Sequence, residues 1–299
     1  MRCRTKILLG IAGATIVAGA GVHFAAMLDM NRERRARLYL GDRLYTESRG
    51  TGTPIVFLPG MQGSTRFWDG SFDSLAGAHR LIFVDELGFG RSPWPEDSPY
   101  DLADQIAALR RTLVALDATQ DVTLLAHSFG TVIAAHYAAA YPGEVRRVVL
   151  LGTPVWESES EARDRIKSMS TLGWTFLANR PLAIATCTAM CAFRPALRRI
   201  LPALDRSRPP EVVRDSVLHD LGSVDGAVGI MLRHPIAKPV QAIGPRVIFV
   251  HGRQDPVTPL ETVEKLARAS GAGLIVVDSD HHDYLTRALG EISSAITSD

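Results

Sequence analysis

The chain has 299 residues, of which 46% are hydrophobic, and its 33 Lys and Arg residues nearly balance its 32 Asp and Glu residues. A formal net charge of +1, with no basic stripe and no recognition motif, argues against a nucleic-acid partner. The length suffices for one α/β domain with an insertion, and no repeat or long low-complexity tract points to another architecture.

Residues 1–37 differ in character from the rest of the chain. Basic residues at positions 2, 4 and 6 precede residues 7–28, an apolar stretch in which only His23 is ionisable, and a basic segment follows. A helix of about 20 apolar residues crosses the hydrocarbon core of a bilayer, and this stretch is long enough to do so. We therefore predict that residues 1–37 form a single-pass membrane anchor with a basic linker.

A cleaved signal peptide is the alternative, which would make the protein secreted. A basic start, an apolar core and the small residues 18–20 are typical of such a peptide. Because the apolar character continues past this site to Leu28, the pattern favours the uncleaved anchor. Basic residues flank the stretch on both sides, so they leave its orientation in the membrane open.

Residues 38–154 alternate between predicted strands and helices. Strands are expected at 55–58, 81–84, 122–126 and 147–151, and helices at 102–116 and 132–140. The glycine-rich turn at 85–92 is too short for a dinucleotide fingerprint, and no helix opens there. Asp85 and Arg91 in this turn are interpreted as turn and ion-pair residues. The alternation predicts an α/β fold with a mostly parallel sheet and helices on both faces.

The turn after the third of these strands carries Ser128. Ala126 and Gly130, two residues before and two after it, are small, as is necessary where neighbouring backbone passes close by. A strand, a tight turn and a helix in this order hold a serine hydroxyl at the sheet edge, with a helix N-terminus behind it. A serine before a helix is also a common N-cap, so this turn alone does not establish a nucleophile.

Residues 155–240 form an insertion that is too long for a plain connection between a strand and a helix. Helical patterns cover 157–172, 181–199 and 210–221, separated by breaks rich in proline. Cys187 and Cys191, four apart on one of these helices, are expected to pack on one face without forming a disulfide. No further Cys or His accompanies them at ligand spacing, so we predict neither a metal site nor a cofactor.

Residues 241–299 return to strands, expected at 246–250 and 274–277, and helices, expected at 259–270 and 284–296. Asp255 lies in the loop after the first of these strands, and the adjacent His281 and His282 follow the second. Ser128, Asp255 and one of the two histidines therefore occur in the order serine, acid, histidine.

Together these motifs resemble the α/β-hydrolase fold superfamily. Residues 126–130 are similar to its G-x-S-x-G nucleophile elbow, with alanine for the first glycine, and residues 85–92 to its D-x-x-G-x-G-x-S turn. Residues 251–259 are similar to its H-G-x-x-D-x-x-x-P loop. The resemblance covers residues 38–297 and implies that the insertion is a helical cap over the active site.

The resemblance also implies a triad. Ser128 is its expected nucleophile and Asp255 its acid. The family's histidine usually lies about five positions past the last strand residue, Val277, which makes His282 the expected base. The neighbouring His281 is the alternative base.

An oxyanion hole is implied in the same way. The backbone N–H groups of Met61 and Phe129 are its expected donors, one after the strand at 55–58 and one next to the serine. Pro59 stands where the family usually has histidine, a departure that leaves both N–H groups in place.

Such a triad supports acyl transfer, because the carboxylate orients an imidazole that takes the proton of the attacking serine. We expect a serine hydrolase that forms an acyl-enzyme with small-molecule carboxylic esters. An apolar or lipid-like acyl group suits both the membrane anchor and the apolar cap. Carbon–carbon bond hydrolases and cofactor-free haloperoxidase-like enzymes share this residue set, and a catalytically silent ligand-binding protein is the alternative of another class.

Overall fold

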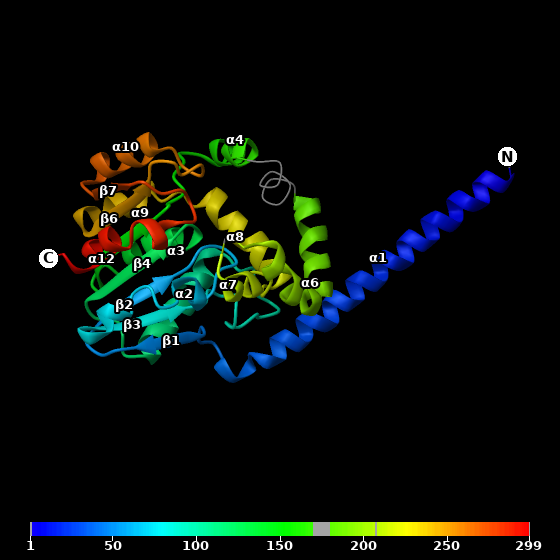
Figure 1. Ribbon diagram of the computed structural model, residues 1–299, viewed down its shortest axis with the longest axis horizontal. Coiled ribbons are helices and arrows are strands. Elements are labelled where there is room, and N and C mark those ends of the chain that lie inside the picture. Colours follow the sequence, from blue (N-terminus) through cyan, green and yellow to red (C-terminus); the bar gives the residue numbers. More distant parts are fainter. Residues whose placement is uncertain (1, 170–179, 207, 299) are drawn as a thin grey trace.

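The computed structural model describes residues 2–169, 180–206 and 208–298, except for the side chains of residues 2–18 and 168–169. At its centre lies a seven-stranded sheet with the order β1-β3-β2-β4-β5-β6-β7 (Figure 1). The strands are β1 (Thr46–Arg49), β2 (Thr53–Leu58), β3 (His79–Val84), β4 (Val122–His127), β5 (Val145–Leu151), β6 (Val247–Gly252) and β7 (Gly273–Val277). β1 pairs antiparallel with β3, and the other neighbouring strands are parallel, which confirms the predicted mostly parallel sheet.

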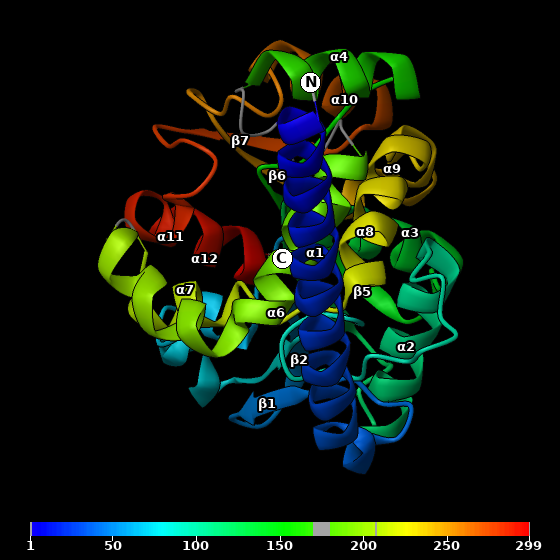
Figure 2. The ribbon, with the colours of Figure 1, turned by 90° about the vertical axis from the view of Figure 1, so that its right-hand side faces the viewer.

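Helices cover both faces of this sheet (Figure 2). Successive side chains of a strand point to opposite faces, so that Val56 and Phe57 of β2 belong to two separate buried clusters. One face is covered by α2 (Leu102–Ala115), α3 (Phe129–Ala140), α9 (Ala237–Ile243) and α10 (Leu260–Ser270), and the other by α11 (Tyr284–Arg287) and α12 (Leu289–Thr297). Burial on both faces explains why the central strands are apolar throughout.

The chain between β5 and β6 is mostly helical. It contains α4 (Glu159–Met169), α6 (Arg180–Leu204), α7 (Pro210–Asp215) and α8 (Leu221–Arg233), followed by α9. Ser64, in the loop after β2, donates a hydrogen bond from Oγ to Asp215 at 2.9 Å. The N–H of Gly90, after β3, donates to the carbonyl oxygen of Leu218 at 2.7 Å. These contacts attach the inserted helices to loops at the carboxyl ends of the parallel strands.

The inserted helices differ from the expected ones in two respects. No helix is expected from the sequence at 222–243, where most of α8 and all of α9 lie. The helix expected at 210–221 is divided, because α7 ends at Asp215 and α8 begins only after Asp220, whose carboxylate accepts the N–H of Gly222 at 2.8 Å. Cys187 and Cys191 in α6 are buried and free, as predicted. The last part of the helix expected at 157–172 lies outside the described residues.

Helix α1 (Arg2–Ala36) extends from the body of the protein, and its C-terminal part packs beside α6 (Figures 1 and 2). Asp29 of α1 forms a buried ion pair with Arg194 of α6. Arg34 forms a second ion pair, at 2.8 Å, with Asp220. The end of α1 is therefore attached to the inserted helices by charged groups that are largely removed from water.

The predicted membrane anchor falls on this helix. Within the described residues, no helix is long and apolar enough to cross a membrane. The described side chains do not include those of residues 7–18, the first part of the predicted span. The anchor therefore remains a prediction from the sequence.

Candidate active site

Ser128 lies in the turn between β4 and α3. Its backbone has φ 49° and ψ −118°, a conformation that costs about 1–3 kcal/mol in a residue other than glycine. Gly130 is required beside it, because a Cβ there would lie 2.4 Å from the carbonyl oxygen of Pro59. Among the described residues, the Ser128 side chain makes no N-capping hydrogen bond. The turn thus has the strained backbone of the expected elbow, and its hydroxyl is not used as a cap.

His281 connects Ser128 to Asp255. Its Nε2 lies 2.9 Å from Ser128 Oγ, and its Nδ1 lies 2.9 Å from Asp255 Oδ2. The three residues follow β4, β7 and β6, whose carboxyl ends meet at one edge of the parallel sheet. Because Nδ1 faces a carboxylate, we assign the proton to Nδ1, which leaves the lone pair of Nε2 facing the serine hydroxyl.

The structure corrects the position of the expected base: His281, and not His282, lies between the serine and the acid. The loop after β7 is tight, because Asp280 Oδ1 accepts the N–H groups of both His282 and Asp283, at 2.7 and 3.2 Å. The two histidine rings lie edge to face with 5.0 Å between centroids, and His281 is buried whereas His282 is exposed. The family's usual offset of about five positions past the last strand residue therefore points one residue too far along this chain.

Asp255 is buried and accepts hydrogen bonds on both oxygens. Oδ2 accepts from His281 and, at 3.0 Å, from the phenol of Tyr284, and Oδ1 accepts the N–H of Val257 at 2.8 Å. Burial raises the pKa of this carboxyl, but the hydrogen bond to His281 and the charge interaction with it lower the pKa further, to about 2. Asp255 is therefore ionised at neutral pH, as the residue that orients an imidazole must be.

Tyr284 is a member of this site that the sequence pattern does not reveal. Its OH accepts the N–H of Gly252 at 2.8 Å and donates to Asp255, so it joins the end of β6 to the acid. Burial raises the pKa of the phenol, which keeps it a neutral donor. A tyrosine at the start of a predicted helix is typical of a core residue, and only the contact between the loops after β6 and β7 shows its role.

His127, immediately before Ser128, supports the loop that carries the base. Its Nε2 lies 2.8 Å from the backbone carbonyl oxygen of His281, and its ring stacks on Phe67 with 5.0 Å between centroids. Burial lowers the pKa of His127 to about 3, so the ring is neutral. Because Nε2 faces a carbonyl, it carries the proton and donates it, which fixes the backbone of His281.

The two expected oxyanion donors lie beside the serine. A Cβ on Gly60 would lie 3.2 Å from Ser128 Cβ, so the loop that contains Met61 passes directly along the serine. Phe129 is the first residue of α3, where backbone N–H groups have no partner inside the helix. Within the described part of the chain, neither the N–H of Met61 nor that of Phe129 has an acceptor. Two free N–H groups at this place are what an oxyanion hole requires.

The site thus contains a hydroxyl, an imidazole, an ionised carboxylate and free N–H groups, the set that acyl transfer uses. Elsewhere in the described ranges, no group of three or more His, Cys, Asp or Glu side chains is placed to hold a metal ion. The family model described as the alpha/beta hydrolase fold matches residues 53–288. This chain belongs to the α/β-hydrolase fold family.

Two relatives of this α/β hydrolase match part of its length. It is 33% identical over 115 residues to the cis-3-alkyl-4-alkyloxetan-2-one decarboxylase of Shewanella oneidensis, covering 38% of this chain and 36% of that protein. It is 32% identical over 108 residues to the probable lysophospholipase BODYGUARD 2 of Arabidopsis thaliana, covering 34% of this chain and 23% of that protein. The match therefore spans 23–36% of the length of these two relatives.

Solved structures resemble the α/β hydrolase over most of its length. The esterase of Exiguobacterium antarcticum superimposes with a TM-score of 0.62 at 21% identity, covering 81% of this chain and 90% of the esterase. At this identity the likeness establishes the fold alone. The family thus establishes the α/β-hydrolase fold of this chain and names neither its reaction nor its substrate.

Proposed function

We propose that this chain is a serine esterase in which Ser128 is the nucleophile, His281 the general base and Asp255 the residue that orients it. The observation that carries the proposal is the continuous path of hydrogen bonds from Ser128 Oγ through the imidazole of His281 to the carboxylate of Asp255. A serine hydroxyl becomes a nucleophile only when a neighbouring base takes its proton, and this path supplies that base.

The reaction proceeds in two halves. Ser128 Oγ attacks the ester carbonyl while His281 Nε2 takes the hydroxyl proton, and His281 then gives that proton to the leaving alkoxide, so that an alcohol and an acyl-serine result. Water attacks the acyl-serine with the same histidine as base, which releases a carboxylic acid and restores the hydroxyl. The N–H groups of Met61 and Phe129 stabilise the oxyanion in both halves, and one such donor is worth about 2.7–4 kcal/mol in a comparable enzyme.

We propose esters with an apolar acyl group as the substrates. The inserted helices attach to loops at the carboxyl ends of the parallel strands, the edge that also carries the triad, and we assign them the role of a cap over the substrate. The lysophospholipase name of one relative supports ester chemistry. The oxetan-2-one in the name of the other relative is a cyclic ester, which makes such a ring a useful member of a substrate panel.

A fluorophosphonate probe tests the assignment of the nucleophile. We expect covalent labelling of the full chain at Ser128, no labelling of Ser128→Ala, and full labelling of the control Ser294→Ala, whose serine lies on the exposed surface of α12. A folded wild-type chain that does not react would contradict the esterase and favour the silent ligand-binding protein. Esters of graded acyl length, assayed on the labelling-competent protein, then define the acyl group.

For localisation, we propose that residues 7–28 remain as an uncleaved membrane anchor. The full chain should then stay with membranes through high-salt and alkaline washing, because salt screens charge-based attachment and does not release an apolar span. The intact mass of the mature protein provides the second measurement. A mature chain that begins just after Ala20 would contradict the anchor and leave the esterase proposal unaffected.

A further inference from the structure

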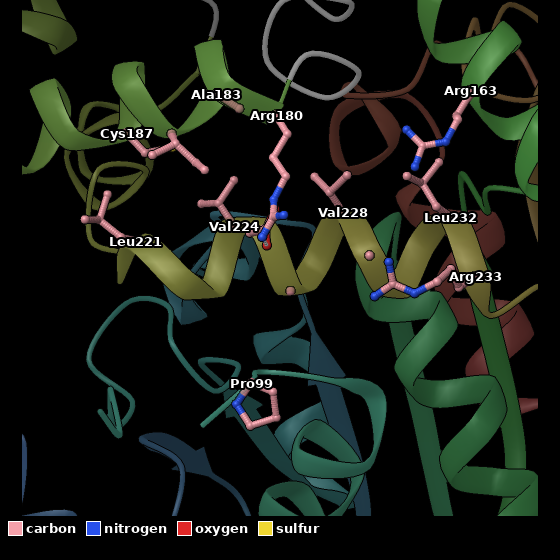
Figure 3. A pocket seen from close by; sticks show the side chains of 14 residues that line it. Pro99, Arg163, Arg180, Ala183, Cys187, Leu221, Val224, Val228, Leu232 and Arg233 are labelled. Carbon is pink, nitrogen blue, oxygen red and sulfur yellow. Dashed lines mark hydrogen bonds and ion pairs between the residues drawn. The ribbon is translucent and has the colours of Figure 1, made fainter. Parts of the chain in front are cut away.

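A cavity lies among the inserted helices. It has a volume of about 360 Å³ and lies between α6 and α8, with Arg163 of α4 at one end (Figure 3). None of Ser128, Asp255 and His281 is among the residues that line it. Its volume lies within the range of about 300–1,000 Å³ that small-molecule sites have in proteins.

Apolar side chains form a strip along the long walls of this cavity. Leu221, Val224, Val228 and Leu232 lie on one face of α8, because their positions are three or four residues apart. They extend from Leu221 to Leu232, which is eleven steps along the helix, or about 16 Å at 1.5 Å per residue. On the other side, α6 contributes Ala183, Ile184 and Cys187. These side chains form an apolar strip along the cavity, whose lining also includes the ion pair between Arg180 and Asp225. The strip has the length of an extended aliphatic chain.

One end of the cavity carries a positive charge that no carboxylate of the described residues neutralises. Arg180 is paired with Asp225 through two contacts of 2.9 Å, and Arg163 is paired with Glu159 at 2.6 Å. Arg233, at the same end as Arg163 and Leu232, has no such partner among the described residues (Figure 3). A guanidinium of this kind presents a fork of N–H donors that matches a carboxylate.

Gly229 determines where the guanidinium of Arg233 lies. A Cβ at position 229 would lie 2.4 Å from Nη2 and 3.0 Å from Cζ of Arg233. The guanidinium therefore folds back over the glycine, one turn earlier in α8, and lines the solvent-exposed end of the cavity. The missing side chain of Gly229 is thus what allows the charge to face the cavity.

We propose that this cavity binds a single-chain aliphatic carboxylate, with its head group on Arg233 and its chain along the apolar face of α8. The apolar side chains would contact the aliphatic part of the ligand, and the unneutralised guanidinium would bind its anionic head group. The volume of the cavity suits one aliphatic chain and not two. The site goes beyond the proposed esterase, since binding at α8 requires no reaction at Ser128. Its ligand belongs to the chemical class of acids that ester hydrolysis releases.

Photoaffinity labelling tests this site. The probe is dodecanoate with a diazirine near the end of its chain, applied to the full chain in detergent or bilayers, followed by peptide mapping. We expect label in α6 and α8, displaced by excess dodecanoate and displaced far less by dodecanol or by acetate. Label confined to the loops around Ser128 and His281, or to residues 7–28, would overturn the proposal.

Two variants test the head-group contact. Arg233→Gln removes the charge, and Gly229→Ala keeps the charge but displaces the guanidinium while favouring the helix. Each should weaken competition by dodecanoate about ten-fold or more, the effect of losing a charge-assisted hydrogen bond. Arg268→Gln, on the distant helix α10, is the matched control and should change nothing.

A third variant tests the apolar strip. Ile184→Asp places a carboxylate in the apolar wall and should reduce labelling, whereas Val114→Asp, at an equally exposed site on α2, should not. Labelling and competition that survive Arg233→Gln would show apolar packing alone and refute the assigned head group. Fluorophosphonate labelling of Ser128 reports the esterase proposal separately, so either proposal can fail without the other.

Discussion

Glu86 is a buried acid outside the triad, and its replacement by glutamine should stabilise the protein. Its side chain follows Asp85 at the end of β3 and is 1% exposed. Neither of its carboxyl oxygens has a hydrogen-bond partner among the described residues. Burial, and next the charge of Asp85, raise the pKa of Glu86 well above its ordinary value of 4.5.

The sign and size of the effect follow from proton linkage. Between pH 4.5 and the raised pKa, the unfolded chain releases the Glu86 proton and the folded chain holds it, so stability falls as the pH rises through this interval. Each pH unit of the interval costs about 1.4 kcal/mol. Glu86→Gln removes this cost, because the amide does not ionise in either state. The amide also lacks partners, so about 1.4 kcal/mol per pH unit is an upper limit.

Urea unfolding of Glu86→Gln and of the wild-type chain, monitored by tryptophan fluorescence from pH 4 to pH 8, measures this difference. We expect the variant to gain free energy of unfolding progressively above pH 4.5 and to match the wild type below it. Glu261→Gln, on the exposed surface of α10, is the control and should show no such pH dependence. A gap that is constant with pH, or one that grows as the pH falls, would refute the burial of a neutral Glu86.

Three further predictions concern the site and its surroundings. His281→Ala should reduce kcat/KM for an ester by several orders of magnitude, and His282→Ala by less than ten-fold; the reverse result would return the base to position 282. Tyr284→Phe should reduce kcat by about ten-fold, since Asp255 loses one donor worth about 1–2 kcal/mol, and an unchanged kcat would assign Tyr284 to the core alone. Burial lowers the pKa of His127 to about 3 and that of His219 to about 4, so below pH 6.5 the unfolded chain binds protons that the folded chain does not. The free energy of unfolding should therefore fall by about 1.4 kcal/mol per pH unit for each of these histidines as the pH decreases below 6.5. His219→Gln should make this slope shallower in urea titrations, and an identical slope would contradict a neutral His219.

The sequence by itself determined the class of fold and most of the chemical groups of the site. Strands recur as short apolar runs between amphipathic helices, and such local patterns predict a parallel sheet whatever the packing. Close backbone contacts require small residues around Ser128, so the spacing of these residues identifies the turn from the sequence alone. The order of Ser128 and Asp255 along the chain is sufficient to bring both to one sheet edge, because parallel strands end on the same side.

Only the tertiary structure decided which histidine faces the serine. The backbone conformation of a single residue decides which of two neighbouring side chains faces the serine. Hydrogen bonds to Asp280 set that conformation in the loop after β7. The role of Tyr284 likewise depends on a contact between two loops that are distant in sequence from the serine. The division of the helix at 210–221 follows from the cap at Asp220 and from contacts with the carboxyl-end loops.

The cavity along α8 also depends on the tertiary structure. A stripe of apolar residues on a helix predicts burial, and the stripe on α8 does not reveal that α6 covers it incompletely. The position of the Arg233 guanidinium depends on the absence of a side chain one turn earlier, at Gly229. Local sequence thus specifies which groups are available, while the packing of distant segments sets the directions in which they point, because a direction depends on contacts that no single segment contains.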